Sequence, residues 1–211
     1  MTTTPAHPVD HLLWGVPDLG LGVNRFAELA GLAPVPGGSH PGMGTANAIV
    51  GAGDGRYLEV IGPDPTQPLG GTLGGLLVDM PVPRLHTWAA RSHDAMASAL
   101  AAREAGLGAE VVEGSRLAPD GSVVRWRNVH LTGHRFGLAL PFLIEWGTAT
   151  RHPATVAPTG CSLLRFEVLH PETLELAHLF AALGIDVEVT HANEPGFAAM
   201  LDTPNGLVRL D

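Results

Sequence analysis

The stretch Val9 to Ala30, VDHLLWGVPDLGLGVNRFAELA, decides how the chain begins to fold. Residues 9–16 are short, apolar and rich in strand-forming side chains. Pro17-Asp18 then offers a turn and a helix cap, and apolar residues recur at helical spacing up to the stop signal at Gly31. The stretch therefore predicts a strand that is followed at once by a helix over residues 19–30.

The residues after this helix predict a loop and a hairpin. Residues 34–44 are rich in Gly and Pro and read as a loop. Two strand-like runs follow, residues 45–51 and 56–61, separated by the turn-like Gly53-Asp54-Gly55. Residues 9–62 therefore form a first β-α-β-β-β unit.

The same order of elements then repeats. A strand over residues 85–91 precedes an Ala-rich helix capped by Asp94, in which Met96, Leu100, Arg103 and Leu107 share a face. Further strands are expected over residues 109–113, 122–131 and 138–146. Residues 84–147 thus form a second unit, joined to the first by a Pro- and Gly-rich linker over residues 63–83 that carries one helical turn.

A third, degenerate unit is expected over residues 161–211, with a strand, a helix and three short strands. A period of about 75 to 85 residues is too long for a solenoid and indicates duplicated modules. Several strands per helix favour antiparallel pairing over a doubly wound parallel sheet. The fold class is therefore α+β, with repeated βαβββ modules whose curved, mixed or antiparallel sheets form a ligand cleft.

Composition limits the classes of function. The chain has 21 acidic and 12 basic residues, a net charge of −9, so it lacks the positive surface that nucleic acid requires. All twelve basic residues are arginines, which excludes a lysine Schiff base and a P-loop lysine.

Three further features of the sequence predict the cellular compartment of the protein. Cys161 is the only cysteine, and no run approaches the roughly 20 apolar residues of a membrane span. Residues 1–8 lack the basic start and apolar run of a secretory signal and read as a loose arm. We expect a soluble, cytoplasmic protein without a membrane partner.

Histidine and glutamate recur at matching places in the first two units. His11 lies in the opening strand and Glu59 in the closing strand of the first unit, and His86 and Glu145 take these places in the second. Alternation puts His11 on one face with Val9 and Leu13. A single histidine or glutamate in a strand is typical of a core or solvated residue, but two of each at matching positions suit a divalent metal ion.

Two other segments offer ligand contacts. The glycine-dense segment 37–47 precedes a strand and not a helix, which argues against a phosphate loop. It is either a tight turn or a pocket wall, and His40, Thr45 and Asn47 are its candidate substrate-binding residues. Arg125 and Trp126 follow each other along a strand and therefore lie on opposite faces. If Arg125 faces the pocket, it would suit a carboxylate substrate; otherwise it lies on the solvated surface of the sheet.

These segments together resemble the glyoxalase-like domain family of the vicinal-oxygen-chelate superfamily. The resemblance rests on residues 9–16, 38–47, 57–61 and 141–146 and covers most of the chain. It implies a divalent ion, Zn, Ni, Mn or Fe, held by a His on the first strand and a Glu on the last strand of each module. The third unit has Arg165 and Asp211 at the corresponding positions, so no metal is expected there.

We therefore expect a metal-dependent lyase or isomerase acting on a small, oxygen-rich molecule, with Glu145 moving a proton. Two alternatives remain open at this point: an extradiol-type dioxygenase, which needs two His and one carboxylate, and a non-catalytic protein that sequesters a small molecule. Since three modules leave one without a partner sheet, a homodimer is also expected.

Overall fold

The computed structural model describes residues 7–211, so residues 1–6 of the predicted arm lie outside the described part. The first part of the chain forms β1 (Val9–Gly15), α1 (Leu19–Ala30), β2 (Val35–His40), β3 (Thr45–Gly51) and β4 (Tyr57–Pro63). After α2 (Leu73–Val78), the order repeats as β5 (Arg84–Arg91), α3 (Ala95–Glu104), β6 (Gly108–Leu117), β7 (Val123–Thr132) and β8 (Phe142–Trp146). The last part forms β9 (Ser162–His170), α4 (Thr173–Leu183), β10 (Glu188–His191), β11 (Gly196–Thr203) and β12 (Gly206–Leu210).

The first helix shows how local sequence sets these boundaries. The Asp18 side chain accepts a hydrogen bond from the backbone N–H of Leu21, which satisfies a free donor of the first turn. Gly31 ends the helix in the left-handed conformation, with φ of 67°. Phe26 and Ala30 are buried against the sheet. The predicted helix over residues 19–30 is confirmed.

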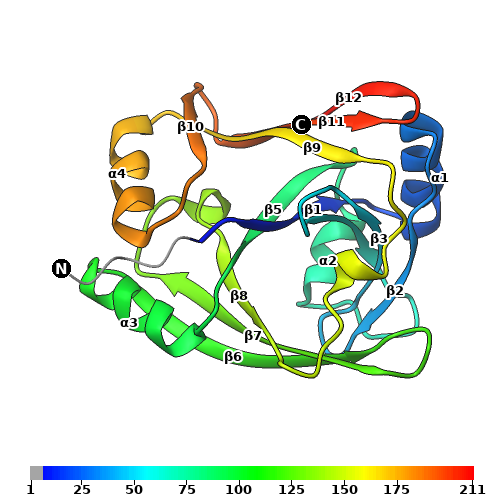
Figure 1. Cartoon of the computed structure of the whole chain (residues 1–211), viewed down its shortest axis with the longest axis horizontal. Helices are drawn as coiled ribbons and strands as arrows, with labels where there is room; N and C mark the ends of the chain where they lie inside the picture. Colours follow the sequence, from blue (N-terminus) through cyan, green and yellow to red (C-terminus); the bar gives the residue numbers. More distant parts are fainter. Residues whose placement is uncertain (1–6) are drawn as a thin grey trace.

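The first two units share one eight-stranded sheet in the order β2-β3-β4-β1-β5-β8-β7-β6. Within each unit the first and last strands are parallel neighbours, β1 with β4 and β5 with β8. The two units meet where β1 pairs antiparallel with β5. The sheet curls, as Figure 1 shows, and a hydrogen bond from Arg116 on the edge strand β6 to the carbonyl of Gly37 on β2 joins its two edges. The predicted α+β fold with repeated modules is confirmed.

Strand β2 corrects the sequence interpretation, which placed a loop over residues 34–44. It pairs antiparallel with β3, with a register shift between Pro36 and Gly38. Glycine is required here because a Cβ on Gly37 would lie 2.3 Å from the Asn47 Oδ1 atom. The composition that suggests a loop therefore allows two strands to approach closely.

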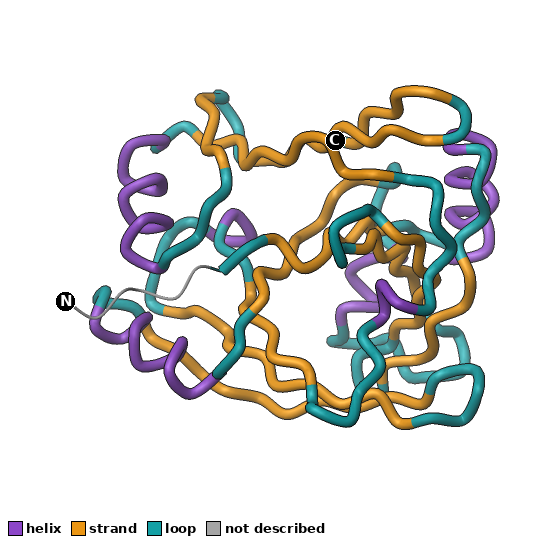
Figure 2. Tube along the Cα trace, in the orientation of Figure 1, coloured by secondary structure: helices purple, strands orange, loops and turns teal. Residues whose placement is uncertain are grey.

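The last part of the chain forms a separate sheet in the order β10-β9-β11-β12, so its strand order differs from that of the first two units. This sheet lies across the outside of the eight-stranded sheet (Figure 1), and α1, α3 and α4 lie at the periphery (Figure 2). Trp88 on β5 is fully buried between the two layers, where it contacts Phe166 and Phe180. The main core is therefore on the outer face of the large sheet, and its concave face remains for the site.

None of the helices in residues 7–211 is long and apolar enough to span a membrane.

Candidate functional site

The concave face of the sheet carries the polar residues of the first unit. On β4, Tyr57 and Glu59 face inward while Leu58 and Val60 belong to the outer core, as strand alternation requires. His11 on β1 stacks on Tyr57 with ring centroids 4.4 Å apart. His11 and Glu59 are only 3% and 5% exposed, so both polar groups are withdrawn from water.

Glu59 faces two imidazole rings from different strands. Its Oε2 atom lies 3.7 Å from His11 Nε2, and its Oε1 atom lies 3.8 Å from His40 Nε2 at the end of β2. Both separations are too long for hydrogen bonds. Within residues 7–211 no hydrogen-bond donor reaches the Glu59 carboxylate, although burial of an unpaired carboxylate is costly.

Each imidazole uses its other nitrogen elsewhere. His11 Nδ1 lies 2.8 Å from Asp10 Oδ1, and it must carry the proton because a carboxylate only accepts. His40 Nδ1 lies 3.0 Å from the Thr45 hydroxyl. Burial lowers the pKa of His40 below its ordinary value, an effect that Glu59 opposes and Arg116 reinforces. In the neutral tautomer that donates Nδ1–H to Thr45, the lone pair on Nε2 of His40 is directed at Glu59.

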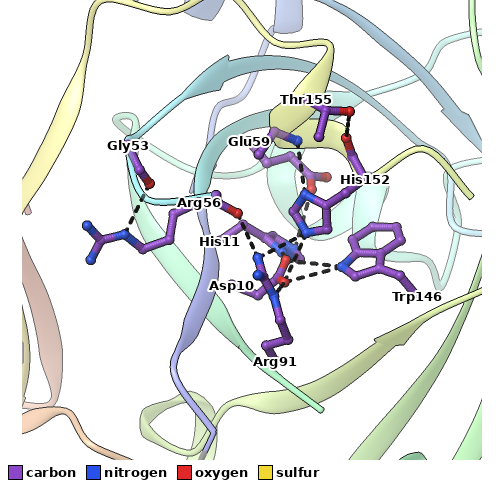
Figure 3. A network of polar contacts seen from close by, with 11 residues as sticks. Asp10, His11, Gly53, Arg56, Glu59, Arg91, Trp146, His152 and Thr155 are labelled. Atoms are coloured by element: carbon purple, nitrogen blue, oxygen red, sulfur yellow. Dashed lines mark hydrogen bonds and ion pairs between the residues drawn. The ribbon is translucent and has the colours of Figure 1, made fainter. Parts of the chain in front are cut away.

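Asp10 is the centre of the network that positions His11 (Figure 3). It is fully buried and accepts from Arg91 Nε at 2.6 Å, from His152 Nε2 at 3.1 Å and from Trp146 Nε1 at 3.2 Å. His152 Nδ1 accepts from the backbone N–H of Ala154, so its proton is on Nε2 and is donated to Asp10. Asp10 thus accepts from β5 and from two residues of the segment 146–152, both of which are far from it in the sequence.

The same contacts keep Asp10 ionised. Burial by itself would raise the pKa of this carboxyl, but hydrogen bonds from His11 and His152 and the attraction of these rings hold it far below its usual range. Burial, together with the nearby Glu59 and Asp10 carboxylates, raises the pKa of Tyr57, so its hydroxyl stays neutral.

Aromatic rings enclose the site on the side of the second unit. Phe142 and Trp146 on β8 lie with ring centroids 5.7 and 6.4 Å from that of His11. Trp126 on β7 makes edge contacts with both Trp146 and His40. These rings border the polar cluster formed by His11, His40 and Glu59, which we call the His-Glu cluster.

The predicted residues of the glycine-dense segment come together at this cluster. Thr45 orients His40, and Asn47 lies on the same inward face of β3 as Thr45. The Oδ1 atom of Asn47 is buried and has no hydrogen-bond partner among the described residues.

Glu145 does not face the His-Glu cluster, which corrects its predicted roles as ligand and base. On β8 it alternates with the inward Trp146, and its carboxylate accepts from the backbone N–H of Ala95, the first residue of α3, at 2.7 Å. Its second oxygen accepts from Arg127 at 2.6 Å. Glu145 therefore lies on the outer, helix-covered side of the sheet and stabilises a helix end.

His86 is also separated from His11. A register shift between β1 and β5 leaves it out of the pairing, and its Cβ stands beside Gly15, about 13 Å along the strand from His11. The residue directly opposite His11 is Ala89. In the first unit His11 pairs with Tyr57, and Glu59 lies two residues further along the same strand. In the second unit Ala89 pairs with Phe142, so the residue two positions further, Ile144, is the counterpart of Glu59. The second unit has apolar side chains at both positions.

Of the two remaining predicted residues, Trp126 faces the site and Arg125 does not. Arg125 is exposed and shares its face of β7 with Arg127 and the core residue Val129. The buried arginine near the site is instead Arg116 on β6. Sequence reasoning also missed Asp10, although a charged residue beside His11 in an apolar strand was an available signal.

A divalent ion implied by the family was tested against these donors. The four-residue set His11, Glu59, His86 and Glu145 does not fit, because two of its members point elsewhere. Among the described residues no group of three or more His, Cys, Asp or Glu side chains already stands at coordinating distances. The His-Glu cluster comes close, because adjacent ligands of one ion lie about 3.0–3.4 Å apart and its separations are 3.7 and 3.8 Å. Its two ring nitrogens and one carboxylate are suitable donor types, with each ring facing a different oxygen of Glu59.

Comparisons with known proteins agree with this fold. A hypothetical protein from Staphylococcus aureus is similar over 97% of this chain and 98% of its own, with a TM-score of 0.69 and 12% identity. A methylmalonyl-CoA epimerase from Mycobacterium tuberculosis aligns with 69% of this chain and 91% of its own, with a TM-score of 0.48 and 17% identity. An epimerase of Streptomyces coelicolor in complex with 2-nitronate-propionyl-CoA covers 66% of this chain and 97% of its own, with a TM-score of 0.46 and 19% identity. At 12% identity, the likeness to the Staphylococcus aureus protein extends to the fold alone.

At the level of sequence, no curated protein gives a significant match. The glyoxalase-like domain, by contrast, matches residues 9–184. These residues include β1 to β9, α1 to α4 and every member of the His-Glu cluster. The chain therefore belongs to the glyoxalase-like domain family.

Proposed function

We propose that this protein is a metal-dependent lyase or isomerase that acts on a small, oxygen-rich molecule such as an α-hydroxycarbonyl compound. One observation carries the proposal: the buried Glu59 carboxylate faces Nε2 of both His11 and His40 and has no hydrogen-bond donor in the described part of the chain. Carboxylate and imidazole groups that face one another without a shared proton are the donors that a divalent cation requires.

His11, His40 and Glu59 would hold the ion, with Asp10 and Thr45 fixing the two rings through their Nδ1 atoms. Carboxylate or hydroxyl partners of this kind orient metal-binding histidines. When bound, the ion supplies Lewis-acid polarisation of a carbonyl oxygen. Glu59 accepts the proton from the adjacent carbon and returns it, because within residues 7–211 it is the carboxylate that faces Nε2 of both rings.

Extradiol-type oxygen chemistry is the second candidate function. It is favoured by the donor types themselves, since two imidazoles and one carboxylate are the ligand set of non-haem Fe(II) oxygenases. Oxygen uptake by anaerobically Fe(II)-loaded protein with a catechol would favour the oxygenase. Proton exchange without oxygen uptake favours the lyase or isomerase.

The test uses a matched pair of variants, Glu59→Gln and Glu145→Gln. Gently purified, tag-free wild type should contain Zn, Ni, Mn or Fe, measured by elemental analysis, and should exchange the carbon-bound protons of dihydroxyacetone for deuterium in D2O. Glu59→Gln should lose the metal and the exchange, because an amide supplies neither charge nor base. Glu145→Gln should keep both, since that carboxylate faces the other side of the sheet.

Two results would contradict the proposal. A wild type that binds none of these ions at millimolar concentration rules out the metal, and ligand binding that is unaffected by chelator then points to a sequestering protein. Equal metal content in the two variants would remove Glu59 from the site.

The homodimer remains a prediction. The first two units pair with each other through β1 and β5, and the third sheet packs on their outer face, so each sheet has a partner within one chain. A monomer in light scattering at micromolar concentration would count against the dimer.

A further inference from the structure

A second feature lies beside the His-Glu cluster and has no role in the function proposed above. It is a cavity of about 280 Å³ between the two edges of the curled sheet. Its wall is mainly aliphatic and is formed by β2, β3, β6, β7, the turn between β6 and β7, and the segment after β8. Its apolar lining residues include Val35, Ile49, Val124, Pro153 and Val156. The volume is near the lower end of the range for ligand pockets, roughly 300–1,000 Å³.

Arg116 puts a buried positive charge into this apolar wall. The residue is only 7% exposed and lines the cavity. Its one hydrogen bond within the described residues goes from Nη1 to the carbonyl of Gly37, a neutral acceptor. No carboxylate among those residues lies within ion-pair distance of it. Asp120, at the rim of the same cavity, is occupied by Ser122 and lies near Arg151 instead.

A buried guanidinium without a counter-charge is costly, and the cost is recovered when an anion binds. Its planar fork of N–H donors matches a carboxylate, and a charged hydrogen bond is stronger than a neutral one. The aliphatic wall at the same place would accept the hydrocarbon part of such an anion. Charge and apolar surface therefore define one kind of ligand.

We propose that this cavity binds a small organic carboxylate, with its carboxylate on Arg116 and its apolar body against Ile49 and Val124. Ile49 pairs with Glu59 across β3 and β4, so a molecule bound here lies next to the His-Glu cluster. The binding does not depend on the proposed metal or on the proposed reaction. If the same molecule is also the substrate, it must carry a carboxylate in addition to the oxygen atoms that bind beside Glu59.

The experiment compares hexanoate with its neutral analogue hexanamide, using full-length protein and NMR titration at low ionic strength. Hexanoate should bind at least about 10-fold more tightly, because a charge-assisted pair replaces a neutral contact. The shifted backbone amides should include those of Val35, Ile49 and Val124. Equal affinity for both probes would overturn the proposal, even if no variant could be purified.

Two arginine variants test whether Arg116 causes the preference for hexanoate over hexanamide. Arg116→Gln should reduce the hexanoate preference to within about twofold of unity. Arg151→Gln removes the same charge from the exposed rim of the same cavity and should retain the preference. Loss of the preference in Arg151→Gln, or its persistence in folded Arg116→Gln, would contradict the assignment.

A repeat in the presence of EDTA separates this proposal from the metal site. A preference that survives the chelator belongs to Arg116 and stands even if the proposed function fails. A preference that disappears with EDTA would mean that the carboxylate binds a metal ion, and the cavity proposal would then be wrong.

Discussion

At the scale of single residues, the hydrogen bonds to Nδ1 decide what His11 and His40 can do. Asp10 and Thr45 each occupy the Nδ1 atom of one ring, and this leaves both Nε2 atoms directed at Glu59. The two partners are not equivalent. Asp10 is tied to Arg91, His152 and Trp146 and holds part of the fold together, whereas the Thr45 side chain bonds only to His40 within the described residues.

Thr45→Val should therefore weaken metal binding without disturbing the fold. The substitution keeps the shape of the buried side chain but removes the hydroxyl that fixes the His40 tautomer. Loss of such a partner typically costs about 10-fold or more in metal affinity. Competition titrations with a chelating dye measure this affinity. Thr203→Val is the matched control, because it removes a similarly buried hydroxyl that bonds to Gly206, far from the cluster. Equal affinities in the two variants would mean that Thr45 does not orient His40.

At the scale of elements, the short helix α2 closes one end of the concave face. Leu77 and Met80 pack there against Leu13 and Ile61. The helix can reach this position because Gly74 has no side chain: a Cβ at Gly74 would lie 1.8 Å from the carbonyl oxygen of Gly44. Gly44 immediately precedes Thr45, so the packing of α2 also holds the strand that carries the His40 partner.

Gly74→Ala should displace α2 and lower the free energy of unfolding by about 1–3 kcal/mol, the usual cost of overpacking a core. Urea denaturation gives this free energy. Gly70→Ala is the control, since a Cβ at Gly70 meets nothing within 4 Å. If Gly74→Ala and Gly70→Ala unfold at the same urea concentration, then the close contact with Gly44 does not constrain the helix.

At the scale of the whole molecule, His7 joins three parts of the described chain. Its backbone N–H donates to the carbonyl of Gly184 after α4, and its Nδ1 atom lies 2.8 Å from the carbonyl of Arg91 on β5. Its Nε2 atom is near the Ser98 hydroxyl on α3. Burial lowers the pKa of His7, an effect that the hydrogen bond to Arg91 opposes and His93 reinforces.

His7 should make the protein less stable in mild acid. Its pKa is lower in the folded protein than in the unfolded chain, so below about pH 6.5 the unfolded chain takes up a proton that the folded protein refuses. This contribution to stability is complete above that pH and is lost as the pH falls, by at most about 1.4 kcal/mol per pH unit.

The measurement is the free energy of unfolding in urea at pH 7.5 and at pH 5.5. The difference between the two values should be smaller in His7→Gln than in wild type. His178→Gln removes an exposed imidazole from α4 and serves as the control. An identical pH dependence in wild type and His7→Gln would show that His7 is not the group responsible.

The sequence by itself determined the elements and part of the site. Caps and short-range periodicity act within a few residues, which is why α1 has the predicted boundaries and why Tyr57 and Glu59 share a face. The segment with His40, Thr45 and Asn47 was predicted to be a tight turn or a pocket wall, because its glycines let the backbone bend or approach a ligand. The structure adds that these glycines let two strands lie close together, and the ligand contact stays a prediction.

Tertiary structure decided what local periodicity leaves open. The helix α3 buries Ala95, Ala99 and Ala102 and exposes Met96 and Leu100, because small side chains let it lie close to the sheet. The face that Met96 and Leu100 were predicted to share is therefore the exposed one.

The prediction that His86 and Glu145 join His11 and Glu59 at one metal ion failed for a related reason. Alternation tells which residues of β8 share a face but not which face is concave, and a shift of one residue exchanges the two. Glu145 is one position from Ile144, the inward counterpart of Glu59, and His86 is three positions from Ala89. Pairing between strands that are distant in sequence sets this register, as it also brings Arg116 to β2. Only the folded sheet therefore places His40, and not a residue of the second unit, beside His11 and Glu59.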